Sequence, residues 1–203
     1  MIVSTNTTYK HYKANVTAGA LLVSESRKIA DLLLSGVDKN NWKDAVENKN
    51  ILQKRSLASA KRIAALIRSR LELMDNGLWD MIVRGDSTLA THATFAAAIK
   101  HCILLGDYLD SIVREQLQRL EDRIPKRCWD EYIAQCAQRD SLMEEFPPST
   151  AKKVRSNIHK ILVEAGYLHD SRSLILQRVE IAQEVLDYLR NRNEDYVLKC
   201  IQV

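Results

Sequence analysis

The stretch THATFAAAIKHCILLGDYLDSIVREQLQRLE, residues 91–121, carries the pattern that decides the fold. Its first half, residues 93–105, is apolar at all but three positions, which indicates a helix buried on more than one side. We expect Ser87 to cap this helix and Gly106 to mark a bend. Beyond the bend, leucine, isoleucine and valine recur at helical spacing until Pro125. The stretch therefore predicts the central scaffold of a mainly helical protein.

The composition around this scaffold is that of a folded, helix-rich chain. The 203 residues are 46% hydrophobic and 28% charged, with six glycines and three prolines, which allows one domain or two small ones. The four cysteines form no CxxC pair and have no histidine at zinc-finger spacing, so we expect packed, reduced thiols and no metal or other cofactor. The start of the chain lacks the apolar core of a signal peptide, and no run reaches the ~18 apolar residues of a membrane span. These features predict a cytoplasmic protein.

Charge is distributed unevenly around the scaffold. Residues 1–75 hold 13 Lys and Arg against 7 Asp and Glu, and residues 149–203 hold 9 against 7. Residues 76–148 hold 8 against 12, within an overall net charge of +4. A polyanion would be attracted to the two ends of the chain and repelled from its middle.

The stretch NKNILQKRSLASAKRIAALIRSR, residues 48–70, carries most of the positive charge on the N-terminal side. A helix from about Thr17 to Gly36 is expected before it, followed by a short helix that Asp38 caps. After a polar turn, Ser56 is a suitable N-cap for a longer helix with one apolar side. The cations at the start and on the polar faces of this unit are candidates for binding phosphates, namely Lys54, Arg55, Lys61, Arg62 and Arg68.

The stretch EEFPPSTAKKVRSNIHKILVEAGYL, residues 144–168, repeats this organisation on the C-terminal side. A short helix is expected at residues 141–146, and a longer one capped by Ser149 or Thr150 and ended by Gly166. Its candidate phosphate-binding residues are Lys152, Lys153, Arg155 and Lys160, and Ser156 and His159 are also expected to point away from the core. The runs LHDSRSLILQRV and DYVLKCIQV alternate as strands do, with a helix at residues 181–191 between them, which predicts a wing-like β element.

These patterns together predict two helix-turn-helix-like units around a central helical scaffold. The expected parts are an N-terminal basic unit at residues 1–75, the scaffold at 76–124 and a winged-helix-like unit at 125–203. A helix-turn-helix presents a basic recognition helix to nucleic acid. Basic faces of amphipathic helices are also often only solvated surface, but the repetition of the pattern favours binding. No residue that reads base edges can be identified, so the expected binding depends mainly on phosphates and is weakly specific.

Catalysis has little support in the sequence. The five histidines are scattered, and His92 and His101 lie in the apolar helix, where a core histidine with satisfied hydrogen bonds is favoured over a base or a ligand. The chain has no GxxxxGK[ST], GxGxxG or GxSxG motif. Paired acids such as Glu121 with Asp122 are best interpreted as solubilising. The sequence therefore predicts a protein that is not an enzyme.

Several of these runs also resemble a known family. NILQKRS followed by AKRIAALIRSRLELM, the central AAAIKHCILLGDYLDSIVRE, the run EAGYL and the ending EDYVLKCIQV are similar to the BrxA family of bacteriophage-exclusion (BREX) systems. The resemblance covers nearly the whole chain. It implies a helical, NusB-like protein that binds double-stranded DNA in phage defence beside a methyltransferase, an ATPase and a phosphatase-like protein.

Three functions follow as hypotheses. The first is a non-enzymatic accessory protein that binds duplex DNA through both basic helices. The second is RNA binding by analogy with NusB, and the third is an adaptor that docks other defence proteins. The sequence leaves open the oligomeric state and whether both basic helices contact one duplex.

Overall fold

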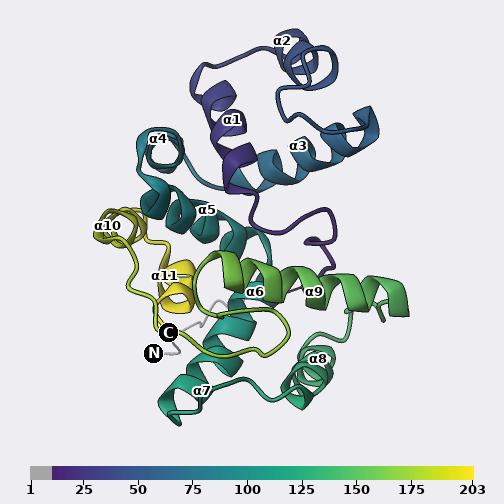
Figure 1. Cartoon of the computed structure of the whole chain (residues 1–203), viewed down its shortest axis with the longest axis vertical. Coiled ribbons are helices and arrows are strands. Elements are labelled where there is room, and N and C mark those ends of the chain that lie inside the picture. The colour runs from purple at the N-terminus through teal and green to yellow at the C-terminus, as the bar shows by residue number, and fades with distance from the viewer. Residues whose placement is uncertain (1–10) are drawn as a thin grey trace, which may run out of the picture.

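The computed structural model describes residues 11–203, and it is mainly helical (Figure 1). The sequence predicts an irregular arm at residues 1–15, of which residues 1–10 lie outside the described residues. The N-terminal helices are α1 (Val23–Leu34), α2 (Lys39–Lys43), the π-helical turn η1 (Asp44–Asn48), α3 (Leu57–Leu71) and α4 (Asn76–Arg84). The central ones are α5 (Ser87–His101), α6 (Ile103–Tyr108), the π-helical turn η2 (Leu109–Val113) and α7 (Arg114–Gln118). The C-terminal ones are α8 (Arg127–Arg139), α9 (Pro148–Glu164), α10 (Gln183–Asn191) and α11 (Asp195–Ile201).

The predicted scaffold is formed by α5 to α7. Residues 93–99 are all buried, which confirms a helix covered on more than one side. The bend lies at Cys102 and not at Gly106, because Cys102 leaves the helical conformation (φ −121°, ψ 96°) and the two segments meet at 106°. Gly106 instead lies inside α6, where a Cβ atom would collide with the Tyr196 hydroxyl. Glycine is therefore required at this position for close packing.

Residues 11–22 form an irregular arm that runs between α3 and α9 (Figure 1). The predicted helical start near Thr17 is wrong, since α1 begins at Val23 after Leu22 adopts a left-handed conformation (φ 62°). The backbone of the arm forms tertiary hydrogen bonds instead of helical ones. Arg70 of α3 donates to the Ala20 carbonyl at 2.7 Å, and Asn157 of α9 donates to the Val16 carbonyl at 2.6 Å. The arm thus joins the two basic helices.

Several predicted helix ends are confirmed. The Asp38 carboxylate accepts the Asn41 N–H at 2.8 Å, and the Ser56 hydroxyl accepts the Ser59 N–H at 3.2 Å. Gly36 adopts the left-handed conformation expected after a helix (φ 62°). The cap of α5 is Asp86 rather than Ser87, because the Asp86 carboxylate accepts the Leu89 N–H at 2.8 Å.

The predicted C-terminal wing is wrong. Within residues 11–203, β pairing is limited to two isolated bridges, Arg123 with Ile175 and Leu168 with Leu176. Residues 167–177 fold back on themselves but turn at Asp170, and the left-handed Leu174 (φ 54°) interrupts any ladder. The first seven residues of the C-terminal run DYVLKCIQV form the whole of α11, which buries residues at spacings of three and four, namely Val197, Cys200 and Ile201.

Two further predictions around α9 are wrong. Residues 141–146 form a turn and an extended segment instead of a short helix. The helix α9 begins at Pro148, so Ser149 and Thr150 lie inside its first turn and neither caps it. Proline suits the first helical position because its ring fixes φ and the position needs no N–H donor. The helix expected at residues 181–191 is confirmed by α10.

One continuous hydrophobic cluster extends from Tyr12 to Ile201 and includes residues from the arm, the scaffold and α8 to α11. Within the described part of the chain, no single helix is long and apolar enough to cross a membrane. Among residues 11–203, one bent pair, Ser87–His101 with Ile103–Gln118, reaches that length and composition together.

Candidate nucleic-acid interface

Three of the five cations predicted to bind phosphate near α3 form internal ion pairs. Lys54 Nζ lies 2.5 Å from Glu25 of α1, and both side chains are largely buried. Lys61 Nζ lies 2.9 Å from Glu47 of η1. An acidic partner cancels much of the field that a phosphate would experience. These pairs therefore weaken α3 as a polyanion-binding face.

Arg68 is also engaged within the protein. Its Nε lies 2.6 Å from Glu72, and its guanidinium lies 4.5 Å from the centre of the Trp42 ring. Arg55 and Arg62 are exposed and form no ion pair with residues 11–203. The structure thus leaves two of the five predicted cations of this unit open to a partner.

The cations of α9 are arranged differently. Lys152, Arg155, Ser156 and His159 occupy one stripe of the helix, at spacings of three and four residues, and line a pocket of about 510 Å³. Lys153 is exposed beside this stripe, outside the pocket lining. Lys160 is also exposed and lies 3.8 Å from Glu164, too far for a strong pair. We call this pocket the α9 pocket. Its full lining comprises Lys126, Lys152, Arg155, Ser156, His159, Ser171, Arg172 and Leu174.

Two more cations complete the α9 pocket from outside the helix. Lys126 comes from the turn before α8, and Arg172 comes from the loop between α9 and α10; Ser171 and Leu174 complete the lining. No carboxylate lines the pocket, and none of its four cations, Lys126, Lys152, Arg155 and Arg172, pairs with an acid anywhere in residues 11–203. Sequence reasoning missed Lys126 and Arg172 because each lies in a loop without a local pattern.

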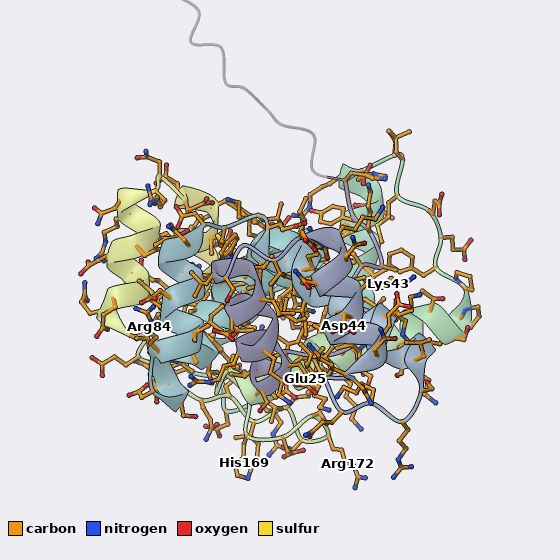
Figure 2. All side chains as sticks on the ribbon, turned by 90° about the horizontal axis from the view of Figure 1, so that it is seen from above. Glu25, Lys43, Asp44, Arg84, His169 and Arg172 are labelled. Atoms are coloured by element: carbon orange, nitrogen blue, oxygen red, sulfur yellow. The ribbon has the colours of Figure 1, made fainter. Side chains whose placement is uncertain are left out.

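A side-chain turn places Arg172 at the pocket. The Asp170 carboxylate accepts the backbone N–H groups of Arg172 at 2.7 Å and Ser173 at 2.9 Å, and it accepts the Ser173 hydroxyl as well. The hydrogen bonds from Ser173, followed by that from Arg172, lower the pKa of Asp170 to about 2. In Figure 2, Arg172 and His169 project from the same edge of the molecule. Arg172 is thus presented on a fixed turn with its charge directed outward.

His159 differs from its prediction as an outward-pointing residue. Only its edge lines the α9 pocket, and the residue is 4% exposed. Its ring packs 5.6 Å from the Trp129 ring and 5.9 Å from the Tyr108 ring, measured between centroids. Burial, and then the neighbouring Arg155, lowers the pKa of His159 to about 4. The histidine is therefore neutral near pH 7 and forms the floor of a pocket whose charge comes from the four cations.

The two histidines of α5 and the four cysteines are buried or partly buried. His92 Nδ1 accepts the Ala182 N–H at 3.0 Å, which confirms the prediction of a satisfied core histidine. Burial lowers the pKa of His101 to about 4, and its Nε2 lies 3.1 Å from the Ser69 hydroxyl. The four cysteines are buried free thiols. Across residues 11–203, no group of three His, Cys, Asp or Glu side chains is placed to hold a metal ion.

Known proteins are similar to this chain over nearly its full length. "BREX protein BrxA" of Paramagnetospirillum magneticum is 48% identical over 192 residues, which cover 95% of this chain and 96% of the relative. "BREX protein BrxA" of Escherichia coli is 28% identical over 95% of this chain and 91% of the relative.

A solved structure shares the fold. The crystal structure of an uncharacterized protein from Magnetospirillum magneticum superposes with a TM-score of 0.89 at 46% identity, and covers 95% of this chain and 99% of that one. The BrxA family profile matches residues 10–193. The chain therefore belongs to the BrxA family.

Proposed function

We propose that this chain is a non-enzymatic, double-stranded DNA-binding accessory protein of a BREX phage-defence system. The observation that carries the proposal is the α9 pocket, which four cationic residues line without an acidic partner among residues 11–203. Like charges held together without counterions are unfavourable, and a phosphate would relieve their repulsion. The names of the relatives support the place in BREX.

We infer that α9 makes the main contact with DNA and that α3 makes a lesser one. Lys153 and Lys160 extend the positive surface along α9, beside the pocket. Arg55 and Arg62 offer a second contact, whereas Lys54, Lys61 and Arg68 are already paired. Binding through phosphates predicts an affinity that falls steeply with salt, by about 0.9 in log K per log unit of salt for each phosphate contacted.

The proposal is tested with a fluorescently labelled duplex of random sequence, titrated at several salt concentrations. Lys152→Glu combined with Arg155→Glu should lower the affinity at least tenfold and reduce the salt slope by about 2, because two phosphate contacts are lost. Arg84→Glu combined with Arg190→Glu is the matched control. It makes the same change in net charge at exposed cations outside the α9 pocket, and should change the affinity little.

Two results would contradict the proposal. If both double variants weaken binding equally, the effect is one of net charge and the pocket has no special role. If single-stranded RNA displaces the duplex at lower concentration than unlabelled duplex does, the chain is an RNA-binding protein instead.

A further inference from the structure

A second concave surface lies beside the first turn of α9. It is a groove of about 580 Å³ between α8, the segment 143–146 and the first turns of α9. We call it the α8 groove, and its lining comprises Trp129, Asp130, Ile133, Ala134, Ala137, Met143, Glu144, Glu145, Phe146 and Ala151. No part of the α9 pocket contributes to it. The two surfaces therefore share helix α9 but no lining residue.

The shape of the α8 groove follows from small residues on an exposed helical stripe. Asp130, Ile133, Ala134 and Ala137 recur at spacings of three and four along α8, so they form one face. Ala134 and Ala137 are exposed, and their short side chains leave the groove open. Apolar side chains from α8 and from the segment 143–146 form its walls. Exposed apolar side chains along an open groove can contact the apolar face of a bound helix.

Acidic residues surround the apolar lining. Asp130, Glu144 and Glu145 border the groove, and no Lys or Arg lines it. None of these three carboxylates forms an ion pair with the described residues, whereas Glu131, one position along α8 from Asp130, faces Arg127 at 3.8 Å. Three unpaired carboxylates around an apolar groove repel nucleic acid and attract a basic partner.

We propose that the α8 groove binds an amphipathic helix of another protein, with apolar residues on one face and Lys or Arg beside them. Helix-in-groove recognition uses apolar anchors at spacings of three, four and seven residues. The stripe from Asp130 to Ala137 extends for roughly 10 Å at about 1.5 Å per residue, which accommodates two turns of such a helix. Met143 adds an unbranched, polarizable wall that adapts to different side chains. Lysines and arginines of the bound helix then face Asp130, Glu144 and Glu145.

The first test uses two labelled 14-residue helical peptides with identical leucine positions, one with lysine and one with glutamate at every polar position. Fluorescence anisotropy with the full chain should give binding of the lysine peptide, and binding of the glutamate peptide at least tenfold weaker. Glu144→Gln with Glu145→Gln should lower the affinity for the lysine peptide at least threefold. Glu121→Gln with Glu184→Gln, exposed acids outside the groove, should not.

The apolar contribution to binding is tested by Ala134→Arg. The arginine side chain fills the groove, and its positive charge repels a basic helix. The variant should bind the lysine peptide at least tenfold more weakly, while Ala65→Arg, an equivalent exposed alanine on α3, should bind as the native chain does. Circular dichroism establishes that both variants fold. A benzophenone on the leucine face of the peptide should cross-link to Met143.

The proposal would be overturned if the two peptides bind equally, or if Ala134→Arg binds the lysine peptide as the native chain does. It would also be overturned if Ala65→Arg loses as much affinity as Ala134→Arg, or if the cross-links form only outside the groove. The duplex DNA titration is run on the same variants. Ala134→Arg should keep its DNA affinity within twofold, so the failure of one proposal is distinguishable from the failure of the other.

Discussion

His159 shows how one buried side chain links the positive pocket to the core. Its ring is enclosed by Trp129 and Tyr108, and its edge faces a pocket with four cations. Burial and the charge of Arg155 both oppose protonation. The neutral ring can therefore support a positive pocket without adding a further charge.

The same residue makes stability depend on pH. With a folded pKa of about 4 and an ordinary unfolded value of about 6.5, the unfolded chain binds more protons between these limits. The contribution of neutral His159 to the free energy of unfolding is complete above pH 6.5. It falls by about 2 to 3 kcal/mol as the pH falls toward 4. Phenylalanine keeps an aromatic ring at this position but does not titrate. Between pH 7 and pH 4.5, the free energy of unfolding of His159→Phe should therefore fall by less than that of the native chain. Urea titrations at the two pH values measure the difference, and an equal loss in both proteins would show that His159 does not titrate as described.

At the scale of the element, Gly106 was recognised from the sequence as structurally important, but the role predicted for it was wrong. Glycine within an apolar helix suggests a bend, but the chain bends at Cys102. Gly106 stays helical because α11 brings Tyr196 against its backbone, and Tyr196 donates to Asp107 at 2.9 Å. This contact joins residues 90 positions apart, so no local pattern could predict it.

Gly106→Ala should therefore destabilise the protein. Alanine is a better helix former by about 1 kcal/mol, so open space at this position would make the change stabilising. The collision with Tyr196 should instead lower the free energy of unfolding by about 1 to 3 kcal/mol. Urea denaturation measures this effect. In a Tyr196→Phe background, which removes the hydroxyl, the cost of Gly106→Ala should be smaller, and additive costs would refute the proposed collision.

Other elements show what the sequence could and could not determine. Helices with a buried stripe, such as α3, α9 and α10, were predicted because local spacing and burial agree. The strands predicted near the C-terminus were wrong, because the run is rich in apolar and β-branched residues, whereas the residues that α11 buries recur at helical spacing. The cations of α9 could be proposed from their spacing, whereas Lys126 and Arg172 are brought to the pocket only by the tertiary fold. The pairing of Lys54 with Glu25 also depends on contacts between distant segments.

At the scale of the whole molecule, α9 contributes to two neighbouring surfaces of opposite charge. Its stripe at Lys152 and Arg155 faces the positive pocket, whereas Ala151 faces the acidic, apolar groove against α8. Both surfaces rest on one helix that packs into the common core through Val154 and Ile158. Duplex DNA at the α9 pocket and a basic helix in the α8 groove would therefore be held in a fixed relation by a single molecule.

If both surfaces are needed in one molecule, substitutions in either surface should weaken phage defence in a bacterium whose BREX system depends on this chain. Lys152→Glu with Arg155→Glu, and separately Ala134→Arg, should each reduce defence at least tenfold, measured as the efficiency of phage plating. The controls Arg84→Glu with Arg190→Glu, and Ala65→Arg, should leave it unchanged. Co-expression of the two defective variants should not restore defence, because each molecule would hold only one of the two ligands. Restoration would mean that the DNA surface and the groove act on separate molecules, which a bridging role for α9 does not allow.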